Sequence, residues 1–115
     1  MFYKHTDDDY QEILPGIRVK TLVYGEKTLM AEFRMQPGAH FTRHSHAHEQ
    51  TGYLVSGAMR LTLGEQVFEV KPGDSWCVPP NAEHYAESLE QTVMIQIFSP
   101  VREDYLAYSP KETRQ

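Results

Sequence analysis

Short runs of apolar and β-branched residues alternate with glycine and proline along most of this chain. The interruptions recur about every 8–12 residues, which is typical of a small all-β sandwich or barrel. No long amphipathic helical pattern breaks the series. The pattern predicts strands at residues 17–24, 28–35, 44–46, 52–55, 59–63, 66–70, 75–78, 83–87 and 92–98.

Turn residues separate these strands and indicate how they connect. Gly38, Gly64 and Asn81 each stand between two runs and tolerate the positive φ that tight turns require. Antiparallel strands joined by such turns close into a double-stranded β-helix, or jelly roll. The sequence therefore predicts an all-β jelly roll over about residues 17–100.

Both ends of the chain are expected to be short, irregular extensions of one domain that spans residues 1–115. The acidic run at residues 7–9 is most simply a solvated loop. Pro100 suits the first turn of a short helix, and a polar tail follows it. The 115 residues, of which 40% are apolar, are enough for one modest core.

Charge and hydropathy exclude two classes of partner. The formal net charge is −5 and no basic run is present, whereas binding to nucleic acid requires clustered Lys and Arg. No apolar run approaches the ~18 residues of a membrane-spanning helix, and the N-terminus is polar and acidic where a signal peptide is basic and apolar. We therefore expect no nucleic-acid partner, no membrane partner, and a soluble, cytoplasmic protein.

Cys77 is the only cysteine, so the chain forms no intrachain disulfide, which fits a cytoplasmic protein. A single thiol between Trp76 and Val78, with no neighbouring base, is most simply a small buried hydrophobic residue. We expect it to be neither a metal ligand nor a nucleophile.

The candidate chemistry lies in two segments that carry histidines at the spacing of metal ligands. His44 and His46 are two residues apart, so in a strand their side chains project to the same side. Gln50 follows after a short break, and a second strand brings His84 from far downstream. We predict that one metal ion is bound by His44, His46, Gln50 and His84.

The chemical types of these side chains indicate which ion they bind. Neutral imidazole and an amide oxygen suit a divalent first-row transition metal, such as Zn, Ni, Fe, Mn or Cu. Because none of the four ligands carries a charge, the ion should act as a Lewis acid and attract a small anionic ligand such as a carboxylate. A histidine-rich stretch alone is also compatible with a solvated loop, but His84 and the glycines that frame both segments favour the metal site.

The two segments resemble the paired motifs of the cupin superfamily. The first motif contains a glycine, His-x-His, a glutamate and a second glycine, and the matching residues are Gly38, His44, His46, Gln50 and Gly57. The second motif is matched by Gly73, Pro79 and His84. Gln50 replaces the usual glutamate, since Glu49 lies one residue early, where a strand side chain points to the opposite face.

The second motif departs from the family at two positions. Asn81 stands where glycine is usual, and Ser88 stands where asparagine is usual. The turn remains feasible because asparagine is the residue that, after glycine, best tolerates a positive φ. The resemblance covers about residues 17–100 and implies a small, single-domain cupin barrel that binds a metal.

The run at residues 92–98 has no face suited to water. One face carries Val93, Ile95 and Ile97, and the other carries Met94, Gln96 and Phe98. We expect a second subunit to cover the outer face, which makes the protein a homodimer. The resemblance implies the same, since small cupins commonly pair through an outer sheet. The alternative is that the chain's own N-terminal segment covers this strand.

A closer resemblance rests on two runs, HSHAHEQ and FSPVREDY, the second of which begins at the end of the last predicted strand. With these runs the chain is similar to the small cupins of uronate catabolism. Those proteins open the ring of 4,5-unsaturated monouronates from pectin or alginate to give a linear keto acid. The resemblance implies that Phe98 and Arg102 line the substrate pocket, where Arg102 offers a planar fork to a carboxylate. Gln96 stands where those enzymes carry a catalytic aspartate, and a carboxamide is neither an acid nor a base.

Other histidines and other functions remain open. His40 and His48 lie near the predicted ligands in the sequence. Either is a candidate replacement base and His40 is also a candidate substrate contact, although both are more often surface histidines. Arg102 is alternatively a surface ion-pair partner. Besides a uronate-converting enzyme, the sequence is compatible with a metal-dependent dioxygenase or with a non-catalytic cupin that binds a small acidic ligand.

Overall fold

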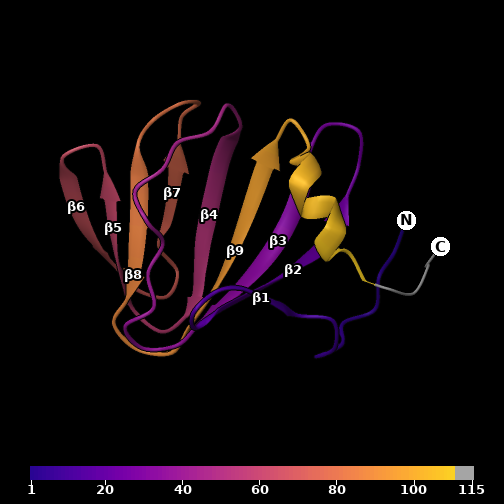
Figure 1. Ribbon diagram of the computed structural model, residues 1–115, viewed down its shortest axis with the longest axis horizontal. Coiled ribbons are helices and arrows are strands. Elements are labelled where there is room, and N and C mark those ends of the chain that lie inside the picture. Colours follow the sequence, from indigo (N-terminus) through magenta and orange to yellow (C-terminus); the bar gives the residue numbers. More distant parts are fainter. Residues whose placement is uncertain (111–115) are drawn as a thin grey trace.

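The computed structural model describes residues 1–110 of the chain (Figure 1). The elements in it are β1 (Gln11–Leu14), β2 (Ile17–Tyr24), β3 (Leu29–Met35), β4 (Glu49–Ser56), β5 (Met59–Leu63), β6 (Gln66–Val70), β7 (Ser75–Val78), β8 (His84–Ser88), β9 (Thr92–Ser99) and the 3₁₀-helix η1 (Glu103–Tyr108). One sheet has the strand order β1-β2-β3-β9-β4-β7, and the other has the order β6-β5-β8. The prediction of an all-β jelly roll is confirmed.

Strand β9 lies between β3 and β4, and its alternation shows how the strands build the core. Met94, Gln96 and Phe98 point inward and are 0%, 6% and 1% exposed, whereas Ile95 and Ile97 are half-buried on the outer side. The largest fully buried side chains come mainly from the six-stranded sheet, and they include Phe33, Phe98, Ile17, Leu29, Met35, Leu54, Met59 and Met94. The interior is therefore apolar except where β2, β4, β8 and β9 carry polar side chains inward.

The N-terminal segment lies over the outer side of β2 and β3. Lys20 Nζ donates hydrogen bonds to the carbonyl and hydroxyl oxygens of Thr6, at 3.1 and 2.9 Å. Arg34 donates to Glu32 and to the hydroxyl of Tyr10, and its guanidinium carbon lies 4.0 Å from the centre of the Tyr10 ring. Burial, followed by the neighbouring Glu32 carboxylate, raises the pKa of Tyr10. The segment is thus fixed to β2 and β3 by polar contacts.

The strand predicted at residues 44–46 is absent, and this prediction is wrong. The residues are irregular apart from an isolated bridge between His44 and His84. The sequence there offers no apolar side chains to bury on one face, so nothing stabilises a regular strand. Strand β1, which was not predicted, has a short and half-polar sequence and forms as an extension of the sheet through its pairing with β2.

Cys77 is exposed, so the expectation of a buried thiol is also wrong. Strand β7 is an edge strand, and Cys77 pairs with Thr51 of β4. Thr51 is itself exposed, so both residues lie on the outer face of the sheet. Trp76 and Val78 are the more buried residues of β7. Because side chains alternate along a strand, the apolar neighbours of Cys77 place it on the opposite, outer face.

The short helix predicted after Pro100 is present as η1. Arg102 is its N-cap residue, and Tyr105 is its buried residue, 7% exposed. The Thr21 hydroxyl donates a hydrogen bond to the backbone carbonyl of Tyr105 at 2.6 Å, which ties η1 to β2. The polar tail expected at the C-terminus falls on residues 111–115, which lie outside the described residues.

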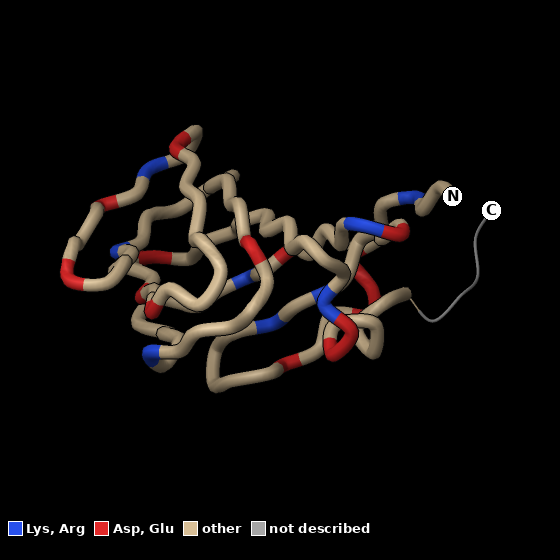
Figure 2. Tube along the Cα trace, turned by 90° about the horizontal axis from the view of Figure 1, so that it is seen from above, with Lys and Arg blue, Asp and Glu red and all other residues tan. Residues whose placement is uncertain are grey.

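Charged residues of both signs are interleaved along the described part of the chain (Figure 2). Several basic side chains approach carboxylates at the surface, as Arg43 does with Glu83 at 3.2 Å and Arg60 with Glu87 at 3.7 Å. Within residues 1–110, no helix has the length and the apolar character needed to cross a membrane.

Gly52 of β4 lies directly opposite Trp76 of β7 and leaves room for its indole ring. A Cβ atom at Gly52 would lie 2.3 Å from two carbons of that ring. We expect Gly52→Ala to lower the free energy of unfolding by about 1–3 kcal/mol, because the added methyl group overpacks the core. Urea titration monitored by fluorescence measures this change.

The matched control is Gly25→Ala, since a Cβ at Gly25 meets no atom within 4 Å. This variant should unfold close to the wild-type midpoint. Equal stability of the two variants would contradict the packing role of Gly52.

Candidate metal centre

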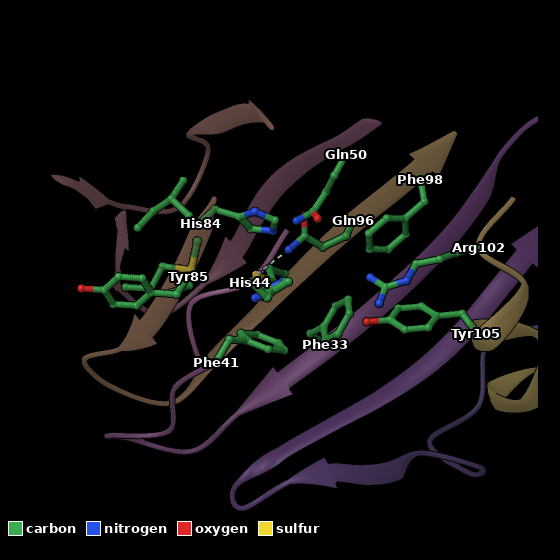
Figure 3. Close-up of a pocket in the computed structure, with 14 residues that line it drawn as sticks. Phe33, Phe41, His44, Gln50, His84, Tyr85, Gln96, Phe98, Arg102 and Tyr105 are labelled. Carbon is green, nitrogen blue, oxygen red and sulfur yellow. Dashed lines mark hydrogen bonds between the residues drawn. The ribbon is translucent and has the colours of Figure 1, made fainter. Parts of the chain in front are cut away.

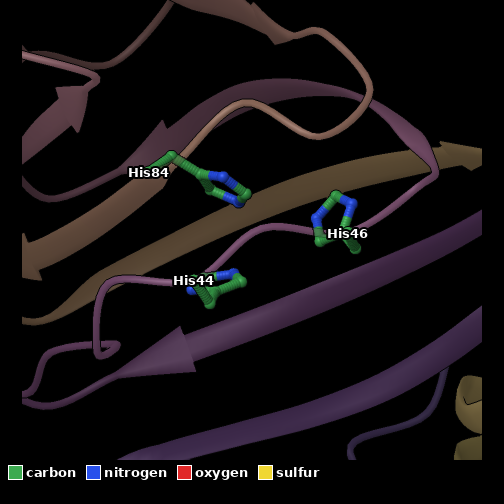
Figure 4. A group of neighbouring side chains, drawn as sticks. All are labelled: His44, His46 and His84. Carbon is green, nitrogen blue, oxygen red and sulfur yellow. The ribbon is translucent and has the colours of Figure 1, made fainter.

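Three histidines from two distant segments meet at one end of the barrel (Figure 4). His44 and His46 belong to the irregular segment between β3 and β4, and His84 begins β8. His44 N donates to His84 O at 3.1 Å, and His84 N donates to His44 O at 2.9 Å. The His46 carbonyl accepts from Asn81 N at 2.7 Å, and Asn81 has φ 66°, as expected for a residue in the place of a glycine. The backbone therefore fixes all three residues.

Each of the three rings presents its Nδ1 atom to a backbone carbonyl. The acceptors for His44, His46 and His84 are the carbonyl oxygens of Thr42, His48 and Ala82, at 2.7, 3.0 and 2.9 Å. Because a carbonyl oxygen only accepts, Nδ1 is the protonated nitrogen in all three rings. Each Nε2 atom therefore carries the free lone pair that a metal requires. The ligand atoms of the three residues lie within 4.8 Å of one another.

Burial favours the neutral form of two of these imidazoles, His46 and His84. His84 is 3% exposed, and desolvation lowers its pKa to about 4, although its hydrogen bond to Ala82 opposes the shift. Desolvation also lowers the pKa of His46. The Nε2 atom of His84 is buried and has no hydrogen-bond partner within the described residues. A lone pair that is buried and unsatisfied is costly, and a metal ion at the centre of the three rings would satisfy it.

Gln50 approaches the same point from β4, and it is 5% exposed while Glu49 is exposed. Its Oε1 atom lies 2.9 Å from Nε2 of His46, and its Nε2 atom donates to Oε1 of Gln96 at 2.7 Å. An amide oxygen and an unprotonated imidazole nitrogen do not attract each other, but both can bind one cation. Two ligands that are each about 2.1 Å from an ion, at a right angle, lie roughly 3 Å apart. The side chains present therefore fit a metal ion.

A pocket opens beside the three histidines, between the two sheets and η1 (Figure 3). The residues that line it are Phe33, Phe41, His44, Gln50, Met59, Leu61, His84, Tyr85, Ala86, Met94, Gln96, Phe98, Arg102 and Tyr105. None of these described residues is Asp or Glu, whereas one is an arginine and two are histidines. The pocket is consequently suited to an anion.

Arg102 forms the cationic side of the pocket, opposite the histidines (Figure 3). Its guanidinium carbon lies 4.2 Å from the centre of the Tyr105 ring and 5.0 Å from that of Phe98. Nε and Nη2 donate to the two carboxylate oxygens of Asp104 at 3.1 and 3.2 Å. One edge of the guanidinium is thus fixed by an ion pair, and its other N–H groups can bind a ligand. Both interpretations of Arg102 from the sequence, as a pocket residue and as an ion-pair partner, apply together.

The structure brings most of the predicted site residues together but leaves His40 and His48 outside the pocket lining. Gln96 and Phe98 line the pocket from β9. His40 is exposed, pairs through its backbone with Glu87, and is not among the lining residues. The ring of His48 lies 5.8 Å from that of His46, centre to centre, and His48 is not among the lining residues.

Tyr105 is a pocket residue that the sequence analysis missed. It follows Arg102 by three residues in η1, and its hydroxyl points toward the cavity (Figure 3). Burial raises its pKa to about 12. The only signal in the sequence was an aromatic residue one helical turn after Arg102, which is equally compatible with packing against the core.

Comparison with known proteins agrees with this geometry. Residues 31–98 match the family model described as Cupin domain. The chain is 31% identical to the pectin degradation protein KdgF of Dickeya dadantii (strain 3937) in an alignment of 104 residues, with coverage of 87% of this chain and 94% of that protein.

Solved structures show the same likeness. KdgF from Halomonas sp. has a TM-score of 0.86 and 32% identity, with coverage of 90% of this chain and 96% of that chain. An RmlC-like cupin from Shewanella frigidimarina NCIMB 400 has a TM-score of 0.80 and 28% identity, with coverage of 84% and 86%. The chain therefore belongs to the cupin domain family, and within that family it is a relative of the pectin degradation protein KdgF.

Proposed function

We propose that this protein binds one divalent first-row transition metal ion and opens the ring of a 4,5-unsaturated uronate. The ligands are His44, His46, Gln50 and His84. The observation that carries the proposal is that the buried, unpartnered Nε2 of His84 and the guanidinium of Arg102 line one pocket without a carboxylate. The likeness to KdgF, a pectin degradation protein, supports the choice of substrate class.

The ligand set suits an anionic substrate. Three imidazoles and a carboxamide are neutral, so the charge of the ion is not compensated by the protein. When bound, the ion supplies Lewis acidity that polarises a hydroxyl or carbonyl oxygen of the substrate. Arg102 binds the substrate carboxylate through the N–H groups that Asp104 leaves free, and the Phe98 ring packs against the sugar.

Ring-opening requires two proton transfers. The C1 hydroxyl loses its proton to solvent water and becomes an aldehyde as the bond between C1 and the ring oxygen breaks. The ring oxygen leaves with the bond pair as an enolate, which becomes a ketone at C5 as C4 gains a proton. Gln96 cannot supply this proton, because a carboxamide does not ionise in this range.

Tyr105 is our candidate for the proton donor. It lines the pocket beside Arg102, and burial raises its pKa to about 12, so its hydroxyl stays protonated at neutral pH. Tyr85 also lines the pocket, but its hydroxyl points away from the histidines (Figure 3). Among the described lining residues, Tyr105 is thus the neutral acid that faces the substrate.

A homodimer is part of the proposal. The N-terminal segment contacts β2 and β3, whereas Tyr53 and Val55 of β4 are 49% and 47% exposed. Tyr53 pairs with Ile95 of β9, so these residues form one apolar outer face. A second copy of the chain would cover this face, since a sheet face of this kind is unfavourable in water.

Removal of one predicted ligand tests the metal site. We expect His84→Ala to weaken Zn²⁺ binding by more than about 100-fold, which exceeds the 10–100-fold loss typical for residues that only orient a ligand. Competition with a chromophoric chelator measures the affinity. His40→Ala is the matched control, because His40 is exposed and outside the pocket. Equal affinities for the two variants would exclude the site.

Turnover of an unsaturated uronate tests the reaction. The metal-loaded protein should remove the ultraviolet absorbance of the enol ether of 4,5-unsaturated galacturonate, and a chelator should abolish this activity. Tyr105→Phe should lower kcat by roughly 100-fold with little change in KM, because it removes the proton donor and keeps the ring. Tyr85→Phe is the control and should retain activity. Absence of turnover by the wild type would refute the proposed reaction.

Disruption of the outer face tests the dimer. We expect the wild type to sediment as a dimer and Tyr53→Glu to sediment as a monomer, because a buried carboxylate without a partner is costly. Val67→Glu is the control, since Val67 is 58% exposed on β6 of the other sheet. A monomeric wild type, or a dimeric Tyr53→Glu variant, would contradict the interface.

A further inference from the structure

Gln50 and Gln96 form a buried pair of carboxamides on the inner face of the six-stranded sheet. They lie on adjacent strands, β4 and β9, and are 5% and 6% exposed. Gly52, which pairs directly with Gln96, has no side chain to separate them. Each carboxamide has one oxygen that accepts and one nitrogen that donates, so each side chain has two orientations that exchange these atoms.

The orientation of the Gln50 carboxamide determines whether Nε2 of His46 faces the amide oxygen or the amide N–H group. In the observed arrangement, Gln50 Nε2 donates to Gln96 Oε1 at 2.7 Å, and Gln50 Oε1 faces Nε2 of His46 at 2.9 Å. In the opposite arrangement, Gln50 Nε2 would donate to His46 and occupy the lone pair that the metal needs. The first arrangement, in which Gln50 donates to Gln96, leaves the His46 lone pair available to a metal ion and is the competent state. The second arrangement is blocked.

The surroundings of Gln96 favour the competent state. Its Nε2 atom lies 3.6 Å from Sδ of Met94, a weak acceptor. Exchange of the two Gln96 atoms would place Oε1 against the sulfur, where no donor is available, and Nε2 against Gln50. Gln96 Oε1 is thus directed at Gln50, and it attracts the Gln50 N–H group.

We infer that Gln96 is a positioning residue for the metal ligand Gln50. It holds the carboxamide oxygen of Gln50 toward the ion and sets the affinity of the site, although it neither binds the ion nor carries a proton. The inference rests on the proposed metal site, but it does not depend on the identity of the substrate. It also gives a role to a carboxamide at the position where the similar uronate-converting cupins carry an aspartate.

A double-mutant cycle separates orientation from general packing. Gln96→Leu removes the acceptor and should weaken Zn²⁺ binding by about 10–100-fold, as is typical for loss of a residue that orients a ligand. In a Gln50→Glu background the same substitution should cost at most a few-fold, because a carboxylate presents an oxygen in either orientation. Zn²⁺ affinity is measured by competition with a chromophoric chelator.

Two controls complete the cycle. Thermal unfolding of each metal-free variant establishes that the fold is retained. Met35→Leu alters another buried side chain of the six-stranded sheet, outside the pocket lining and the hydrogen-bonded pair, and should leave the Zn²⁺ affinity within a few-fold of wild type.

The outcomes distinguish this inference from the proposed function. An equal loss of Zn²⁺ affinity on Gln96→Leu in both backgrounds, or no loss in either, would overturn the positioning role and leave the metal site intact. A wild-type protein that binds no Zn²⁺ would remove the metal site itself. A loss confined to the Gln50 background would support the inference.

Discussion

The pair of backbone hydrogen bonds between His44 and His84 is the constraint on which the site depends. It joins the irregular segment before β4 to the first residue of β8 and so links the two sheets at the mouth of the pocket. The centres of the two rings are consequently 4.2 Å apart. The carbonyl groups of the same segments then fix the Nδ1 protons, so the backbone sets both the position and the tautomer of the proposed ligands.

The second property of the site is its lack of acidic groups. A metal ion at this site would be held by neutral side chains, near a guanidinium and away from carboxylates. Such an ion attracts a small anion more strongly than an ion whose charge is neutralised by an acidic ligand. Among residues 1–110, the carboxylate that pairs with Arg102 belongs to the exposed Asp104, which fixes the guanidinium in place. Neither Gln50 nor Gln96 can transfer a proton, which is why the proposed reaction assigns that step to Tyr105.

Much of the fold and part of the site could be predicted from the sequence. The two-residue period of a strand correctly placed Gln50 inside and Glu49 outside, and Asn81 has the positive φ that its turn position required. The approach of the three histidines was also predicted, although the reason given was wrong. His44 and His46 were assigned to a strand, but an isolated bridge and the Asn81 contact bring them together.

The remaining features depend on contacts that no local pattern contains. The exposure of Cys77 follows from the edge position of β7, and the formation of β1 follows from its pairing with β2. Tyr105 reaches the pocket only because η1 packs against β2 through Thr21. The hydrogen bond between Gln50 and Gln96 joins residues 46 positions apart.

The proposed metal site is tested most directly by a crystal structure of the Zn²⁺-loaded protein with anomalous data collected at the zinc edge. We predict one anomalous peak at about 2.0–2.2 Å from Nε2 of His44, His46 and His84 and from Oε1 of Gln50. A zinc ion bound through Nδ1 atoms, through Glu49, or at another place on the molecule would contradict it.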